Sequence, residues 1–367
     1  MRVLIAPDKF AGTLTAVQAA EAMADGWRRT AAHDDLELVP LADGGPGFLD
    51  VLADSLGGDL VAVNVRGPLA QEVPATVLVV GDTAYVEAAQ ACGLALVPPE
   101  RRDPTVASSY GVGELVAAAV DAGVPRVVVG LGGSATNDGG AGLLAALGAV
   151  ADGGPLDAGG LALGDVTGVD LAPALERLRG VEVVVASDVD NVLAGPGGAS
   201  MVYGPQKGAT REQAAALDTA LQHWGRVTGE TVARAAGAGA AGGLGHALLL
   251  LGGRRVNGIE AVMDATGMAE RVARADLVLT GEGAFDWQSL RGKVVAGVAR
   301  VAAGSGTPVV VLAGRVLVGR REMSAIGVEA AYAVADSPAE VRAAMERPAH
   351  TLADLAARVA RSWSGGG

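Results

Sequence analysis

The feature that most constrains the fold is an alternation of short apolar runs with alanine-rich stretches of helical pattern. The apolar runs are rich in Val, Ile and Leu, which is typical of strands buried in a parallel sheet. The runs expected as strands are Arg2–Ala6, Leu36–Pro40, Leu60–Val65, Ala75–Val80, Ala84–Ala88, Arg126–Val129, Val181–Ala186, Asp276–Thr280, Pro308–Ala313 and Ala330–Val334. The stretches expected as helices are Ala16–Thr30, Gly113–Ala122, Gly139–Val150, Glu212–Thr228 and Lys293–Ala303. This pattern predicts an α/β fold of βα units around mainly parallel sheet.

The length of 367 residues is sufficient for two domains, each with its own core. Both terminal segments show compact βα patterns, whereas the middle of the chain contains longer Gly- and Pro-rich stretches. We therefore expect one α/β domain formed by both chain ends and a second α/β domain inserted into it. The expected ranges are 1–62 and 272–367 for the first domain and 63–271 for the second. An active site is expected in the cleft between them.

Composition excludes several classes of protein. Half of the residues are hydrophobic, yet no stretch approaches the roughly 20 apolar residues of a membrane span. Asp8 lies where a signal peptide would still be apolar, so no export signal is expected. The single cysteine, Cys92, excludes an internal disulfide framework, and the net charge of −13 argues against nucleic acid or an anionic membrane as partner. These features predict a soluble cytoplasmic protein that acts on small molecules.

Polar side chains and glycines follow five of the expected strands. The segments are PDKFAGT, LADGGPG, GLGGSATNDGG, SDVDN and GEGAFDWQ. In parallel α/β sheets, ligands bind outside the carboxyl ends of the strands. Five such strand ends predict a shared binding site.

The segment GLGGSATNDGG, residues 130–140, is the strongest phosphate-binding candidate. Its glycines allow backbone N–H groups to approach an anion, and Ser134 and Thr136 add hydroxyl donors. Asn137 or Asp138 can cap the helix expected after it, whose N-terminus favours negative charge. A tight βα turn with an Asx cap explains the same residues equally well.

Two further segments carry carboxylates. Asp188 and Asp190 lie two residues apart after a strand, where paired carboxylates can hold Mg²⁺ or accept a proton from an attacking hydroxyl. A pair of solvated turn aspartates is the alternative. The other segment supplies Glu282, Asp286, Gln288 and Lys293, and its alternative is an exposed capped helix.

Lysine is rare in this chain, which otherwise uses arginine for positive charge. The three lysines, Lys9, Lys207 and Lys293, all lie in loops rich in Gly, Pro or polar residues. Such a bias indicates positions that need a compact ammonium group, although three lysines can also fall there by chance.

Several common catalytic motifs are missing or misplaced. The GxGxxG match that begins at Gly237 follows a helical stretch instead of a strand, which argues against a nicotinamide-dependent dehydrogenase. A P-loop and the HRD and DFG kinase motifs are absent, and no histidine suggests a Ser–His–Asp triad. Carboxylates, glycine loops and isolated lysines are typical of phosphoryl transfer, where catalysis consists mainly of positioning and charge neutralisation.

Taken in order, the sequence blocks resemble the bacterial glycerate kinase type 1 family. The blocks are APDKFAGTLTA, LADGG, SSYGVGEL, GLGGSATNDGGAGLLAALG, SDVDN, YGPQKGAT, GAGAAGG and DLVLTGEGAFDWQSLRGK. The resemblance implies an ATP-dependent kinase that phosphorylates D-glycerate, usually at the 2-hydroxyl, and a Rossmann-like domain formed by both chain ends. Ala11 and Pro46 depart from the FKG and ADGGEG patterns of many members, so the exact substrate is less firmly implied than the reaction class.

The resemblance and the motifs together give a set of expected site residues, with ATP and Mg²⁺ as cofactors. Asp188 or Asp190 is expected to accept the proton of the glycerate hydroxyl, with Asp188 favoured, and Lys207 or Lys293 to neutralise the transferred phosphoryl group. Substrate contacts are expected from Asp8, Lys9, Asp43, Arg66, Glu282, Asp286, Gln288 and Arg315. Phosphate contacts are expected from Gly132, Gly133, Ser134, Ala135, Thr136 and Asn137, and metal contacts from Asp190 and Glu282.

Three alternatives stay open at this point. The chain could phosphorylate a related small hydroxy acid, produce 3-phosphoglycerate, or bind a small acid without catalysis. A homodimer is also an open expectation, because the sequence does not fix the oligomeric state.

Overall fold

The computed structural model describes residues 1–364, and the chain forms two compact units. Of the described residues, the first unit contains 1–43, 50–57 and 259–364, and the second contains 44–49 and 58–258. The predicted mixed α/β class, with mostly parallel sheets, is confirmed. No helix of residues 1–364 combines the length and apolar character needed to cross a membrane.

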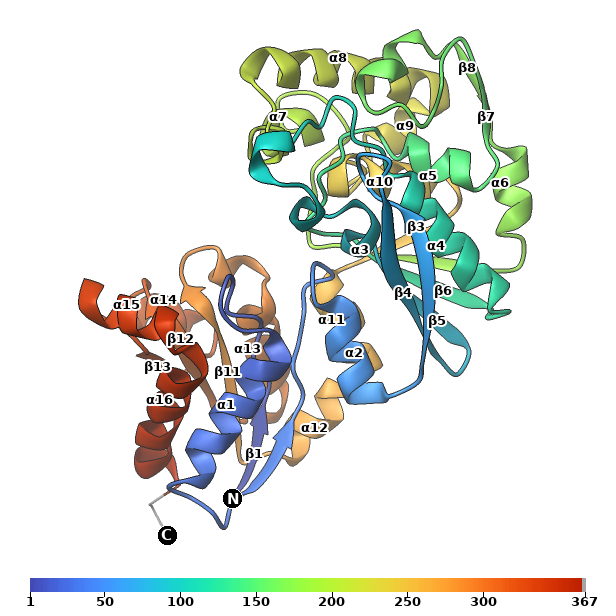
Figure 1. The fold of residues 1–367 in the computed structure, drawn as a ribbon. Coiled ribbons are helices and arrows are strands. Elements are labelled where there is room, and N and C mark those ends of the chain that lie inside the picture. The colour runs from blue at the N-terminus through green and yellow to red at the C-terminus, as the bar shows by residue number, and fades with distance from the viewer. Residues whose placement is uncertain (365–367) are drawn as a thin grey trace. The chain divides into compact units, whose positions relative to one another are not determined.

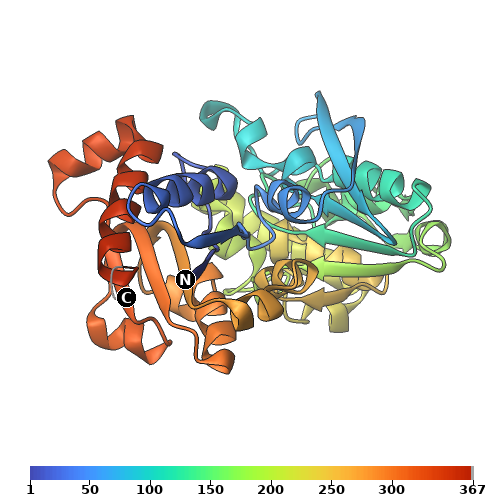
Figure 2. The same ribbon diagram turned by 90° about the horizontal axis from the view of Figure 1, so that it is seen from below.

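The first unit has a five-stranded, fully parallel sheet in the order β13-β12-β11-β1-β2. Both ends of the chain belong to this unit (Figure 2). Its strands are β1 (Arg2–Ile5), β2 (Asp35–Leu38), β11 (Leu277–Phe285), β12 (Val309–Val316) and β13 (Ala330–Ala333). Its helices are α1 (Ala16–Arg28), α12 (Met268–Arg274), α13 (Val294–Ser305), α14 (Arg320–Ala325), α15 (Pro338–Glu346) and α16 (Pro348–Trp363).

Alternate residues of these strands face opposite layers of helices. Val3 and Leu279 join the buried cluster formed with Trp27 of α1 and Leu355 of α16, and these two helices lie side by side (Figure 1). Helices α12 and α13 contact β1, β11 and β12. Both faces of the sheet are therefore covered, as a fully parallel sheet requires.

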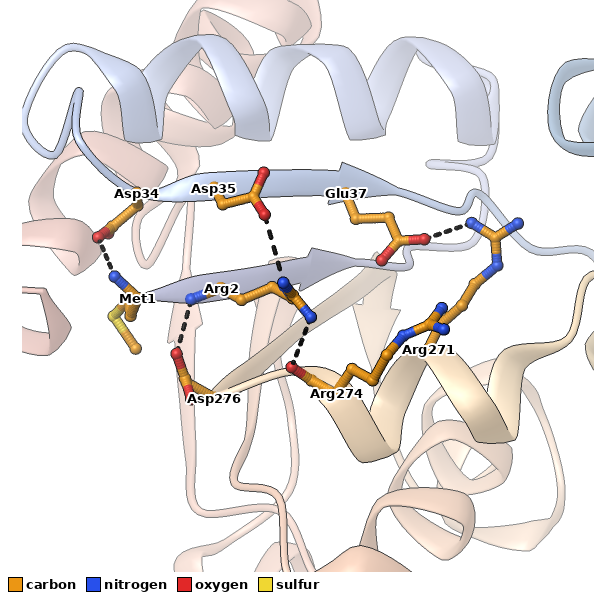
Figure 3. A network of polar contacts seen from close by, with 8 residues as sticks. All are labelled: Met1, Arg2, Asp34, Asp35, Glu37, Arg271, Arg274 and Asp276. Carbon is orange, nitrogen blue, oxygen red and sulfur yellow. Dashed lines mark hydrogen bonds and ion pairs between the residues drawn. The ribbon is translucent and has the colours of Figure 1, made fainter.

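Charged groups connect β1 and β2 to the segment that contains α12 and the residues after it, as Figure 3 shows. The Asp276 carboxylate accepts a hydrogen bond from the Arg2 backbone N–H at 2.7 Å, and the N-terminal ammonium pairs with Asp34 at 2.8 Å. Arg271 of α12 pairs with Glu37 of β2. These contacts hold β1 and β2 to α12 and to the start of β11.

The second unit has a six-stranded mixed sheet in the order β10-β9-β6-β5-β4-β3 and a two-stranded antiparallel sheet, β7-β8. Its strands are β3 (Asp59–Arg66), β4 (Glu72–Val80), β5 (Thr83–Glu87), β6 (Arg126–Gly130), β7 (Val150–Asp152), β8 (Gly168–Asp170), β9 (Glu182–Ala186) and β10 (Arg254–Val256). Its helices are α3 (Ala89–Cys92), α4 (Tyr110–Asp121), α5 (Ala141–Ala146), α6 (Ala172–Arg177), α7 (Ala199–Tyr203), α8 (Arg211–Thr228), α9 (Glu230–Ala233) and α10 (Leu244–Leu250).

The unit boundaries differ from the expected domain boundaries. A boundary at 62/63 would divide β3, which pairs with β4 along its whole length, and one at 271/272 would divide α12. The chain instead changes unit at 57/58 and at 258/259, and the short segment 44–49 also belongs to the second unit. Helices α2 (Phe48–Leu56) and α11 (Gly258–Ala265) each begin in the second unit and continue in the first.

Candidate functional site

The carboxyl ends of three adjacent strands in the first unit bring four predicted residues together. Asp8 follows β1, Asp43 follows β2 and Glu282 lies in β11, while the Lys9 ammonium lies 3.8 Å from the Asp43 carboxylate. The Asp8 backbone N–H donates to the Gly281 carbonyl at 2.8 Å, which places Asp8 beside the strand that carries Glu282. The first unit therefore concentrates carboxylate and ammonium groups at one edge of its sheet.

Burial raises the pKa of two of these carboxyl groups. Asp8 and Glu282 are each 7% exposed. Burial, and secondly the Asp43 carboxylate, raise the pKa of Asp8 to about 6, although Lys9 and Lys293 act in the opposite direction. Burial raises the pKa of Glu282 to about 7, with Asp8 adding to the effect. Such perturbed groups are typical of functional sites.

The other predicted residues of the first unit lie around this cluster. Lys293 is the N-cap residue of α13 and acts electrostatically on both Asp8 and Glu282. Asp286 accepts a hydrogen bond from the Gln288 backbone N–H at 2.8 Å, in the turn after β11. Arg315 is exposed on β12. The Ala11 backbone lies beside Gly283, so this departure from the family pattern is next to the cluster.

In the second unit, the glycine loop between β6 and α5, residues 131–140, divides into an accessible and a buried half. Gly132 and Gly133 are the accessible positions. Gly133 has a φ of +63°, and a Cβ at Gly132 would lie 2.6 Å from the Gly45 Cα atom, so both positions require glycine. A Cβ at Gly133 would lie 2.8 Å from Pro46, which places this second departure from the family pattern directly against the loop.

Lys207 reaches this loop from inside the unit. Its side chain, carried by the 3₁₀ turn Pro205–Lys207, is 3% exposed. The ammonium donates to the Ser134 hydroxyl oxygen at 2.9 Å and to the Thr136 carbonyl at 2.7 Å. Burial lowers the pKa of Lys207 to about 8. The Lys207 side chain thus holds the glycine loop by two hydrogen bonds from inside the unit and does not project into solvent.

The C-terminal half of the loop is used for internal structure. Thr136, Asn137 and Asp138 are fully buried, and the Asn137 amide donates to the Ser200 hydroxyl at 2.7 Å. Asp138 accepts hydrogen bonds from the backbone N–H groups of Gly140 and Gly142 at the start of α5. Its carboxylate occupies the helix N-terminus that a phosphate was expected to use. The Asx-cap interpretation therefore holds for this half, and Gly132, Gly133 and Ser134 stay as the candidates for contact with a phosphate.

Replacing Asp138 by asparagine is expected to lower the free energy of unfolding by at least about 2 kcal/mol, because it leaves buried donors without acceptors. The Asp138 carboxylate also accepts from the backbone N–H and the hydroxyl of Ser109, at 2.7 and 2.8 Å. Urea unfolding measures the effect, with the exposed Asp165→Asn as a matched control expected to stay within about 0.5 kcal/mol. Equal stabilities of the two variants would contradict this structural role.

The aspartates after β9 have different environments. Asp188 is half-buried, and its Oδ1 atom accepts a hydrogen bond from the Gly258 backbone N–H at 2.7 Å. Asp190 is 80% exposed and pairs with the Arg255 guanidinium at 2.6 Å. This pairing argues against the expectation that Asp190 holds a metal ion.

Arg66 is also already engaged. Its guanidinium pairs with Asp157 at 2.8 Å and lies 3.8 Å from the centre of the Tyr110 ring. A substrate carboxylate would have to displace these contacts. Lys9 has the more suitable surroundings, at the carboxylate cluster of the first unit.

Glu282 and Asp8 of the first unit are better suited to hold a magnesium ion than Asp188 and Asp190 after β9. The Glu282 Oε1 atom is buried and has no hydrogen-bond partner within the described part of the chain. A nearby divalent cation would relieve the repulsion between Glu282 and Asp8, whose pKa values are both raised. Residues 1–364 hold no cluster of three or more His, Cys, Asp or Glu side chains placed for a metal, so substrate oxygens would complete the ligand set.

The sequence interpretation missed Glu87, which holds the residues that follow the LADGG segment. Glu87 ends β5, is 6% exposed, and accepts hydrogen bonds from the backbone N–H groups of Gly47 and Leu49 at 3.1 and 3.2 Å. It thereby fixes Gly44–Leu49 to the second unit and against the glycine loop. A single acidic residue at the end of a strand matches no sequence motif. The one signal in the sequence that could have indicated Glu87 is the presence of a carboxylate within an apolar run.

Comparison with known proteins identifies the family. The model of the glycerate kinase family matches residues 3–364. A protein named glycerate kinase from Halalkalibacterium halodurans is 41% identical, with 99% of this chain and 98% of that protein covered. A protein named glycerate 2-kinase from Escherichia coli is 40% identical, with 92% and 91% covered.

A solved structure agrees with the sequence comparison. A crystal structure described as glycerate kinase 2 from Salmonella typhimurium has a TM-score of 0.85 and is 39% identical, and the match covers 100% of this chain and 99% of that one. The predicted family resemblance is thereby confirmed, as is the prediction of a kinase. The chain therefore belongs to the glycerate kinase family.

Proposed function

We propose that the protein transfers the γ-phosphoryl group of ATP to the 2-hydroxyl of D-glycerate, which gives 2-phosphoglycerate and ADP. The carboxylate and ammonium cluster of the first unit carries this proposal, since phosphoryl transfer to a small acid needs both kinds of group. The relative named glycerate 2-kinase supports the choice of hydroxyl. We also propose that the enzyme works in the cytoplasm, in keeping with its single, buried thiol, Cys92.

Each charged group has a role in this proposal. The ammonium groups of Lys9 and Lys293 attract the substrate's negative charge, and Lys293 neutralises the phosphoryl group during transfer. The N–H groups of the Gly132–Ser134 segment hold phosphate oxygens. Glu282 and Asp8 would hold Mg²⁺, which neutralises charge on the phosphate oxygens when it is bound.

Asp188 is the proposed general base. The Gly258 N–H fixes the orientation of its carboxylate, so that it can accept the proton of the glycerate hydroxyl as the phosphoryl group arrives. The more exposed Asp190 is occupied by Arg255. The structure thus supports the preference for Asp188 that its position next to the strand suggested.

The proposal is tested by ADP formation from ATP and Mg²⁺ in the presence of D-glycerate, L-glycerate, glycolate or no acid. We expect ADP formation with D-glycerate and much less with the other acids. A non-catalytic binding protein would bind D-glycerate in calorimetry without forming ADP. A higher kcat/KM for another hydroxy acid would show that this protein, with its departures from the family pattern at Ala11 and Pro46, prefers a substrate other than D-glycerate.

A further inference from the structure

Ser134 has an unusual hydrogen-bonding state. Its hydroxyl oxygen accepts from the Lys207 ammonium at 2.9 Å, and the side chain is 5% exposed. A hydroxyl has one proton to donate. Because the Lys207 ammonium already donates to the Ser134 oxygen, the hydroxyl proton must point away from Lys207. Over the described chain, no acceptor receives the Ser134 hydroxyl proton. Because buried polar groups nearly always have a hydrogen-bond partner, a buried hydroxyl donor without an acceptor in the protein indicates a bound ligand as its partner.

The neighbouring backbone offers donors of the same kind. The N–H groups of Gly132, Gly133 and Ser134 donate to no group within residues 1–364, whereas the next N–H, that of Ala135, donates to the Cys92 carbonyl at 2.7 Å. Gly133 in the left-handed region makes successive N–H groups converge, as in other anion-binding backbone segments. Three backbone donors and one hydroxyl donor therefore occur together.

We infer that Lys207 is a positioning residue that holds the Ser134 hydroxyl as a donor, so that Ser134 and the N–H groups of Gly132 and Gly133 together bind a phosphate group of the nucleotide. Lys207 then acts through Ser134 and the Thr136 carbonyl, and its ammonium does not touch the transferred phosphoryl group. The inference rests on the proposed function for the identity of the ligand. It replaces the expectation that Lys207 itself neutralises the phosphoryl group.

The test is a double-mutant cycle of Ser134→Ala, Lys207→Met and the double variant, with ADP affinity measured by calorimetry and KM and kcat by ADP formation. We expect each single variant to raise the Kd for ADP and the KM for ATP about tenfold or more, with kcat changed far less, since a hydrogen bond to a charged group is lost. Because both residues act through one hydroxyl, the double variant should bind ADP about as weakly as the weaker single variant.

The matched control is Ser200→Ala, which removes the buried partner of Asn137 in the same loop. This control should lower stability without changing ADP affinity more than about threefold. Multiplicative losses in the double variant, an unchanged ADP affinity for Ser134→Ala, or a raised KM for D-glycerate alone would overturn the inference. If Lys207→Met does not fold, Lys207→Arg replaces it, because a guanidinium cannot reproduce the compact donor geometry.

The ADP measurement separates this inference from the proposed function. Absence of glycerate phosphorylation by the wild-type protein would refute the proposed function. A tenfold weaker ADP affinity of Ser134→Ala, with the non-additive double variant, would still support the phosphate site.

Discussion

Replacing Asp188 by asparagine is expected to lower kcat for glycerate phosphorylation by about 100-fold or more, while the KM for each substrate changes little. Asparagine preserves the shape of the side chain, and its carbonyl oxygen can still accept the Gly258 N–H, which Asp188 accepts at 2.7 Å. The amide cannot take up the proton of the attacking hydroxyl, and positioned general bases contribute about 10²–10⁴-fold to rate. Steady-state kinetics of ADP formation measures the effect.

Two comparison variants make this result specific. Asp121→Asn removes an exposed carboxylate that pairs with Arg177, and it should leave kcat unchanged. Asp190→Asn should cost much less than Asp188→Asn, because Asp190 is exposed and paired with Arg255. Turnover of Asp188→Asn close to that of the wild type would remove Asp188 from the role of base, and a larger loss for Asp190→Asn would assign that role to Asp190.

Replacing Glu282 by glutamine is expected to abolish most activity and yet to stabilise the protein at pH 8 in the absence of Mg²⁺. Burial raises the pKa of Glu282 from 4.5 to about 7, so the folded state retains a proton that the unfolded chain has released between these pH values. Stability due to this group therefore falls as the pH rises from 4.5 to 7. Above pH 7 the full cost of about 3 kcal/mol applies, and glutamine avoids it.

Urea unfolding in EDTA at pH 5 and pH 8 measures this effect. The stability advantage of Glu282→Gln should be small at pH 5 and large at pH 8, whereas the exposed Glu329→Gln should show no such dependence. Mg²⁺ with ATP should stabilise the wild type more than Glu282→Gln if Glu282 holds the ion. A variant that is less stable than the wild type at pH 8 would contradict the account of a strained, functional carboxylate.

The strands of the two large sheets were the most predictable part of the fold. All ten predicted strands occur, since runs rich in Val, Ile and Leu favour extended backbone. Their ends differ from the prediction by a few residues at most positions. The three-residue strands β7, β8 and β10 were not predicted, because so few residues carry too little periodicity. The predicted helix at 139–150 is shorter, since Gly139 and Gly140 adopt left-handed backbone and Val150 begins β7.

The candidate site was only partly predictable for a physical reason. Asp8, Asp43 and Glu282 could be assigned to one site from the sequence, because each lies at the carboxyl end of a predicted strand and parallel strands end at the same edge of a sheet. The burial of Lys207 was not predictable, since it depends on contacts with Ser134, which lies 73 residues earlier in the chain. By contrast, Asp138 caps α5 as the sequence allowed, whereas Asn137, expected at a phosphate, is buried against Ser200.

The most direct test of the central claim is the identity of the product formed from D-glycerate, ATP and Mg²⁺. The product is passed to enolase with and without phosphoglycerate mutase, and phosphoenolpyruvate is measured. Phosphorylation at the 2-hydroxyl predicts phosphoenolpyruvate with enolase alone, because enolase acts on 2-phosphoglycerate. Phosphoenolpyruvate that appears only after addition of the mutase would show phosphorylation at the 3-hydroxyl, and no phosphoglycerate at all would contradict the proposed activity.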